Sequence, residues 1–161
     1  MAATRVHGIA DGYVAAYAAL DPTSATAVGI DDHPTLLTDH SPVGIAARDD
    51  LARSTRAALA TAEPVGDRDR IAAAYLDERL ASSLRLADLG ESFRNLNVLG
   101  GPLQDTRQVF DLMDRATLED WERIAARMAA IPASLDSARR TLDVGVDRGL
   151  VAARRQAIGV R

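Results

Sequence analysis

Residues 93–113 read FRNLNVLGGPLQDTRQVFDLM, and they differ in character from the rest of this 161-residue chain. The segment holds both phenylalanines, both asparagines and the only Gly-Gly pair, whereas most of the chain is rich in alanine. Glycine allows tight turns, and asparagine amides satisfy the backbone of a turn. The segment therefore predicts an irregular turn between two groups of helices, with a joint near residues 91–102.

The residues before this joint show helical periodicity, with apolar side chains recurring at three- and four-residue steps. The predicted main helices cover residues 4–20, 42–62 and 67–88. Asp21 with Pro22, and Ser41 with Pro42, each pair a capping residue with a proline, which is typical of helix starts. A short helix is expected over residues 22–29, followed by a loop, and Asp67 is expected to cap the third main helix.

Helical signals also dominate after the joint. Thr117 and Asp120 resemble a capping box, and Pro132 should end or kink the helix that follows. The apolar stripe predicted for that helix consists of Leu118, Trp121, Ile124, Ala125, Met128 and Ile131. The next helix should be broken up by Gly145 and Gly149, and a final helix is expected over residues 150–160.

No segment shows the alternating pattern of a β-strand. The sequence predicts an all-α fold of about seven or eight helices packed as antiparallel hairpins, with no sheet. Residues 1–161 are expected to form a single helical domain. Because its core would consist largely of alanine and leucine, little apolar area is buried per side chain. We therefore expect a homo-oligomer, or a second chain, to cover exposed apolar helix faces.

Composition narrows the classes of function. The net charge of −4 argues against a nucleic-acid partner. All nineteen basic residues are arginine, which we interpret as codon usage in a GC-rich bacterium, and no cysteine is present for disulfides or thiolate chemistry. No apolar run approaches the roughly 20 residues of a membrane span, and no signal peptide is recognisable. The sequence thus predicts a cytoplasmic bacterial protein.

Residues able to support catalysis are sparse. The histidines are His7, His33 and His40, and none begins a His-Glu-x-x-His helix. His33 and His40 lie in an acidic loop that we interpret as solvated, so neither a metal nor another cofactor is expected. No Gly-x-Ser-x-Gly elbow exists, and adjacent carboxylates are interpreted as exposed partners of arginine. No catalytic residue is assigned.

The joint supplies the candidate site residues. Gly100 and Gly101 precede a helix start, where an anion can bind, but the Gly-x-x-x-x-Gly-Lys spacing is missing and a tight turn is the favoured interpretation. Asparagine and glutamine amides can either support the turn, which we favour, or face a cleft. The candidate cleft-facing or turn-supporting residues are Asn95, Asn97, Gly100, Gly101, Gln104 and Asp105.

Residues 95–113, NLNVLGGPLQDTRQVFDLM, resemble a hallmark of a large bacterial family, the domain of unknown function 885 (DUF885). Further similar segments are residues 21–29, 37–42, 142–149 and 153–156, together with Trp121. The resemblance implies a mainly helical, cleft-forming protein similar to zinc metallopeptidases and several times longer than this chain. In such relatives zinc is expected at a His-Glu box in the C-terminal part, so no catalytic or metal residue carries over to this chain.

The resemblance implies that the chain corresponds to an N-terminal segment, either a truncation or a naturally short member. Its expected function is non-catalytic, forming one wall of a substrate cleft or an assembly surface. Two alternatives stay open: a stand-alone helical module for binding or oligomerisation, and a small enzyme of unknown reaction.

Overall fold

The computed structural model describes residues 4–30 and 32–159, and every regular element in that part of the chain is a helix. The all-α prediction is therefore confirmed. The elements are α1 (Arg5–Leu20), α2 (Pro22–Ala27), α3 (Pro42–Ala60), α4 (Gly66–Asp88), η1 (Glu91–Arg94), α5 (Pro102–Gln108), η2 (Val109–Leu112), α6 (Leu118–Ala129), α7 (Ile131–Asp147) and α8 (Arg154–Gly159), where η marks a 3-10 helix. Residue 160, at the end of the predicted final helix, lies outside the described residues.

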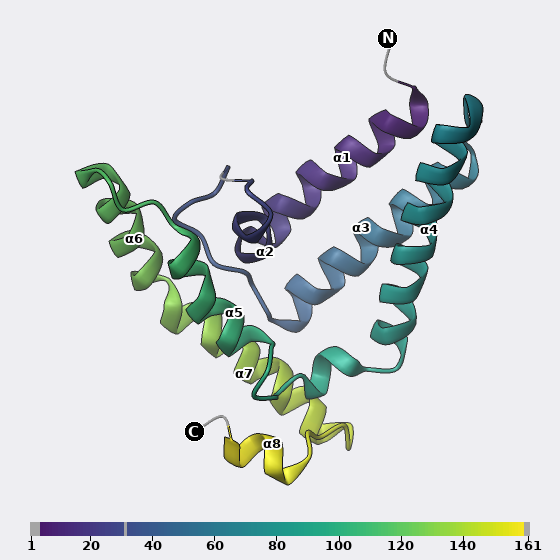
Figure 1. Cartoon of the computed structure of the whole chain (residues 1–161). Coiled ribbons are helices and arrows are strands. Elements are labelled where there is room, and N and C mark those ends of the chain that lie inside the picture. Colours follow the sequence, from purple (N-terminus) through teal and green to yellow (C-terminus); the bar gives the residue numbers. More distant parts are fainter. Residues whose placement is uncertain (1–3, 31, 160–161) are drawn as a thin grey trace.

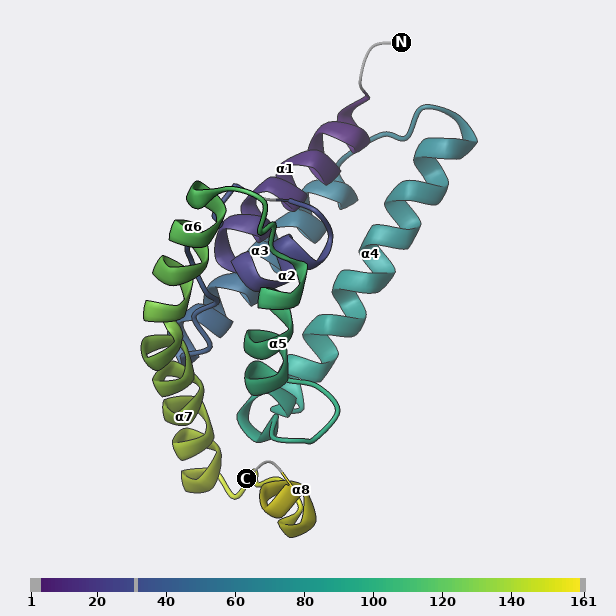
Figure 2. The ribbon, with the colours of Figure 1, turned by 60° about the vertical axis from the view of Figure 1, so that its left-hand side comes forward.

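Two groups of helices diverge from the joint at η1 (Figure 1). In the first group, α3 packs against both α1 and α4, and α3 and α4 form an antiparallel hairpin. In the second group, α5 runs alongside α7, while α6 and α7 continue one another (Figure 2). The break between α6 and α7 falls at Ala130, with Pro132 in the first turn of α7, as the sequence predicted. α2 connects the groups by packing against α1, α5 and η2.

Three of the predicted helix starts have the expected caps. Asp21 accepts a hydrogen bond from the Ser24 backbone N–H at 3.0 Å, and Ser41 accepts one from that of Gly44 at 3.2 Å. The capping box of Thr117 and Asp120 is present with both of its reciprocal bonds. Such caps satisfy backbone groups that a helix leaves unpaired at its first turn.

The cap predicted at Asp67 is wrong. Helix α4 begins one residue earlier, after Val65, and Asp67 points to solvent as the partner of Arg70. The buried acid of this turn is Asp69, which accepts from the Val65 backbone N–H at 3.0 Å and from Thr4 Oγ1 at 2.9 Å. His7 Nδ1 lies 3.0 Å from the same carboxylate. Asp69 therefore links the start of α4 to the start of α1.

Replacing Asp69 with asparagine should lower the melting temperature by several degrees near neutral pH, because the charged acceptor of this link is lost. The Val65 N–H, followed by Thr4 and His7, holds the pKa of Asp69 below its usual 3.8. The Asp69 carboxylate thus binds a proton less tightly in the folded state than in the unfolded state. Its contribution to the free energy of unfolding is present above the pKa of the unfolded state and is lost as the pH falls through the pKa of the folded state.

Asp67→Asn is the matched control for this effect, since that side chain is exposed. Thermal melts over a range of pH should show the acid-dependent loss flattened in Asp69→Asn and unchanged in Asp67→Asn. Equal melting curves for the two variants would show that Asp69 has no special role.

The prediction that Gly145 breaks α7 is also wrong, because the helix continues through this residue to Asp147. Gly145 is buried, and a Cβ there would overlap the carbonyl oxygen of Phe93 and lie 2.7 Å from that of Leu150. The glycine therefore permits a close approach of backbones rather than a bend. Gly149, with a φ of 71°, lies just beyond the helix end and helps to terminate it.

The apolar stripe of α6 is only partly buried. Ile124 is buried, but Leu118, Trp121 and Met128 are 76%, 53% and 55% exposed. On α4, Leu80 and Leu84 join the core with Ala52, whereas Ile71 and Tyr75 are exposed. Helical periodicity identifies which face of a helix is apolar, but not whether another segment covers that face. These side chains are therefore exposed although their spacing predicts burial. None of the described helices is both long and apolar enough to cross a membrane.

Candidate binding pocket at the helix joint

The joint is built by a sharp change of direction after α4. Gly90 adopts a φ of 73°, in the left-handed region, and donates from its N–H to the Ala87 carbonyl at 2.9 Å. The 3-10 helix η1 then carries the chain against the end of α7. There the guanidinium of Arg148 lies 4.4 Å from the centroid of the Phe93 ring. The joint is thus fixed to the second group of helices by a cation–π contact and by the approach to Gly145.

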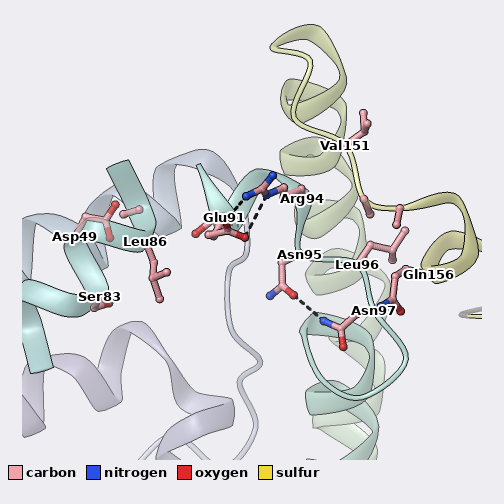
Figure 3. Close-up of a pocket in the computed structure, with 14 residues that line it drawn as sticks. Asp49, Ser83, Leu86, Glu91, Arg94, Asn95, Leu96, Asn97, Val151 and Gln156 are labelled. Carbon is pink, nitrogen blue, oxygen red and sulfur yellow. Dashed lines mark hydrogen bonds and ion pairs between the residues drawn. The ribbon is translucent and has the colours of Figure 1, made fainter. Parts of the chain in front are cut away.

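Asn97 holds the turn that follows. Its Oδ1 accepts hydrogen bonds from the backbone N–H groups of Leu99 at 3.0 Å and Gly100 at 2.9 Å. Its Nδ2 donates to Asn95 Oδ1 at 3.3 Å, as drawn in Figure 3. The two amides therefore act together: Asn97 supports the backbone, and Asn95 is oriented by Asn97.

The two glycines of this turn have different environments. Gly101 has a φ of 107° and a ψ of −178°, and a Cβ there would lie 2.9 Å from Asn95 Oδ1. Gly100 has no positive φ, and a Cβ added to it would meet no atom within 4 Å. The need for glycine is therefore concentrated at Gly101, which directly precedes α5.

Gly101→Ala should reduce the free energy of unfolding by about 1–3 kcal/mol, because its backbone conformation is essentially restricted to glycine. Gly100→Ala should change it by less than about 0.5 kcal/mol, since neither strain nor contact opposes the methyl group. Urea denaturation of both variants measures the difference. An equal effect at the two positions would contradict this account of the turn.

A pocket of about 860 Å³ opens at the joint (Figure 3). It lies between the end of α4, η1 and the segment that leads into α8. Its lining is Asp49, Ser83, Leu86, Ala87, Glu91, Ser92, Arg94, Asn95, Leu96, Asn97, Val151, Ala152, Ala153 and Gln156. Glu91 and Arg94 form an ion pair that lowers the pKa of Glu91. The other polar groups of this pocket are the carboxylate of Asp49, whose pKa burial raises, and several amides and hydroxyls.

The remaining candidates lie on two sides of α5. Gln104 lines a second cavity of about 210 Å³ that also includes Asn95 and Asn97. Asp105 instead lines a separate cavity of about 90 Å³ with Ser24 of α2. Burial, followed by the negative charge of Asp21, raises the pKa of Asp105. The structure thus brings Asn95, Asn97 and Gln104 together and leaves Asp105 apart.

A family model described as "Bacterial protein of unknown function (DUF885)" matches residues 22–160, which is most of the chain. The chain belongs to the DUF885 family. No curated protein matches it. The DUF885 match starts at Pro22, so it includes both helical walls of the joint pocket and excludes α1.

Sequence reasoning missed two residues of this DUF885 chain, His40 and Arg48. The interpretation of the loop as solvated is wrong for His40, whose backbone N–H donates to Ser137 Oγ at 2.8 Å and whose carbonyl accepts from Thr141 Oγ1 at 2.6 Å. Both residues line a cavity next to the joint pocket. The sequence held one signal for Arg48. This residue follows the Ser41 cap by about two helical turns, so it lies on the same face of α3 as the loop that precedes the helix.

Proposed function

We propose that this DUF885 chain is a non-catalytic, cytoplasmic region of a metallopeptidase-like protein and that its joint forms one wall of a substrate cleft. The observation that supports the proposal is the joint pocket, whose volume of about 860 Å³ falls in the usual range of ligand sites. Residues 95–97 of the pocket lining also belong to residues 95–113, the segment that resembles the family hallmark.

The polar groups of the pocket suit a peptide. An amide side chain offers both donors and an acceptor, and it can therefore pair with a peptide backbone in either direction. Within the described residues, Asn95 Nδ2 and the side-chain amide of Gln156 have no hydrogen-bond partner, whereas Asn97 is committed to the turn. Asn95 and Gln156 are the side chains that would contact the backbone of a bound peptide.

Titration of ¹⁵N-labelled chain with short alanine-rich tripeptides tests this proposal. The expected result is a saturable set of amide shift changes concentrated in residues 91–97 and 151–156. Shift changes that are absent, or that cluster away from the joint, would remove the support for a cleft wall. The same titration with a tripeptide blocked at both ends reports whether the peptide backbone alone is recognised.

Among the described residues, the histidines and carboxylates do not fit a zinc site. His7 lies beside Asp69 at the start of α1, whereas His40 is held against α7. Within the described ranges, no group of three or more potential metal ligands comes together. We accordingly derive no catalytic step through a metal, and zinc is proposed only for longer metallopeptidase-like relatives.

Incubation with zinc, followed by gel filtration and metal analysis, should leave no stoichiometric metal on the chain. Binding of one zinc per chain would overturn this account of the histidines. A His40→Gln variant would then identify whether the cavity at His40 is the site.

A second candidate function, an assembly surface, is supported by the exposed apolar side chains of α4 and α6. Ile71 and Tyr75 on α4, and Leu118 and Trp121 on α6, are all more than half exposed. On each helix the two side chains are three or four residues apart and share a face, and exposed apolar faces commonly mark interaction sites. We propose that a second copy, or another chain, covers these faces in the assembled protein.

Sedimentation velocity over a range of concentrations tests self-association. The expected result is a sedimentation coefficient that rises with concentration, and a smaller rise for Trp121→Glu. A strictly monomeric chain at high concentration would contradict the homo-oligomer.

A further inference from the structure

A small polar cavity of about 100 Å³, lined by His40 and Arg48, adjoins the joint pocket, since Ser92 and Asn95 line both. His40, Arg48 and Thr141 contribute most of its remaining polar lining. These residues come from the loop before α3, from α3, η1 and the following turn, and from α7. The cavity therefore lies where the two groups of helices meet.

The histidine of this cavity is fixed in place and has an unused ring nitrogen. Its backbone is tied to α7 through Ser137 and Thr141. His40 Nε2 is buried, and no hydrogen-bond partner for it exists among the described residues. Buried polar atoms normally have a partner, and a ligand oxygen in the cavity would supply one that the described residues do not.

Arg48 presents further unused donors. Its Nη1 donates to the carbonyl oxygens of Asp39 at 2.9 Å and Leu20 at 3.3 Å, which anchors one side of the guanidinium. In the described part of the chain, Nε and Nη2 make no hydrogen bond. A guanidinium has five N–H donors in a planar fork that matches two oxygens of one anion.

The charges around the cavity disfavour a dianion more strongly than a monoanion. Burial, followed by the positive charge of Arg48, lowers the pKa of His40, while Asp21 and Asp39 oppose this shift. A neutral His40 can donate one hydrogen bond from Nε2, and Arg48 supplies one positive charge. The nearby Asp21 and Asp39 carboxylates would repel a dianion such as phosphate more strongly than they repel a carboxylate.

We propose that this cavity binds a carboxylate group, with Arg48 and His40 donating hydrogen bonds to its oxygens. The carboxylate comes either from a small free acid or from the end of a larger ligand lying in the joint pocket, and the second source rests on the proposed cleft function. A planar monoanion of two oxygens fits both the size of the cavity and the fork of Arg48.

Titration with sodium acetate, at constant ionic strength set with sodium chloride, tests the site in chain labelled at histidine and at the backbone. The expected result is a saturable change in the ring signals of His40 and in the backbone signal of Asn95. The pKa of His40 should rise with acetate, because the bound negative charge offsets that of Arg48. Changes that do not saturate, or that chloride and phosphate reproduce, would show that the cavity has no site for a carboxylate and would overturn the proposal.

Two variants separate binding from folding. Arg48→Lys keeps the charge but loses the fork, and should weaken acetate binding on the order of tenfold. Arg53→Lys, in the same helix, is the control and should leave binding unchanged. If Arg48→Lys does not fold, His40→Leu removes the Nε2 donor without touching the backbone contacts. Acetate binding at wild-type strength in a folded His40→Leu or Arg48→Lys protein would overturn the assignment.

Tripeptides distinguish the two sources of the carboxylate. If a free-carboxyl tripeptide shifts His40 and its amidated form does not, the carboxylate belongs to a ligand of the joint pocket. If acetate shifts His40 but neither tripeptide does, the site takes a small free acid. The lack of tripeptide binding then counts against the cleft function and not against this site.

Discussion

Gly145→Ala should reduce the free energy of unfolding by about 3 kcal/mol or more, the upper end of the usual cost of overpacking. The added methyl group would overlap the Phe93 carbonyl oxygen and press against that of Leu150. Both obstacles are backbone atoms, which cannot rotate away as a side chain can. Either α7 or η1 must move, so the amide signals of the joint should change together with the stability.

Gly8→Ala is the matched control, because this residue also lies in a helix but a Cβ there meets no atom within 4 Å. Alanine is the better helix former, and the variant should be stabilised by about 0.5–1 kcal/mol. Urea denaturation thus gives effects of opposite sign for the same chemical change. A stabilised Gly145→Ala protein would contradict the close contact between α7 and the joint.

Arg127→Met should destabilise the fold by about 3 kcal/mol, since it removes several hydrogen bonds made by a buried charged group. Arg127 is 0% exposed and donates to the carbonyls of Leu36 at 2.9 Å and Pro22 at 3.1 Å, and to Thr26 Oγ1 at 2.9 Å. Methionine retains an unbranched apolar stem but leaves these acceptors without their donor. The side chain therefore connects α6 to α2 and to the loop before α3.

Arg139→Ala is the control for a generic arginine effect. Arg139 lies on the exposed side of α7 and pairs with Asp136 and Asp143. Exposed ion pairs contribute less than about 1 kcal/mol, so its loss should have a small effect. Comparable losses of stability for Arg127→Met and Arg139→Ala would contradict the role assigned to Arg127.

The features predicted correctly from sequence are those determined within a few residues. Asp21, Ser41 and Thr117 cap helices through backbone groups three positions away, and Pro132 marks a helix start for the same local reason. Composition predicts a joint near residues 91–102, because glycine and asparagine have few other roles in so helical a chain. The family was likewise identified from local runs of residues.

The features missed depend on contacts between distant segments. Asp69, rather than Asp67, is the buried acid because Thr4 and His7 of α1 meet it. Position 145 needs a glycine because the carbonyl of Phe93, 52 positions earlier in the sequence, approaches it closely. The conformation of its own helix does not require glycine. No local pattern records such an approach, and it is the fold as a whole that brings Arg48 and His40 to one cavity.

The most direct test of the central claim, that the joint pocket binds a peptide, is to fill the pocket and measure binding. Ser83 is exposed and lines the pocket, so Ser83→Trp should occupy it without disturbing the core. Ser54→Trp makes the same change at an exposed position of α3 away from the pocket.

The measurement is the affinity of each folded protein for the free-carboxyl tripeptide, from amide shift titration. We expect Ser54→Trp to bind as the wild type does and Ser83→Trp to lose at least about tenfold in affinity, since a large side chain would exclude the ligand. Equal affinity of the wild type and Ser83→Trp would contradict the claim that the joint forms the wall of a binding cleft.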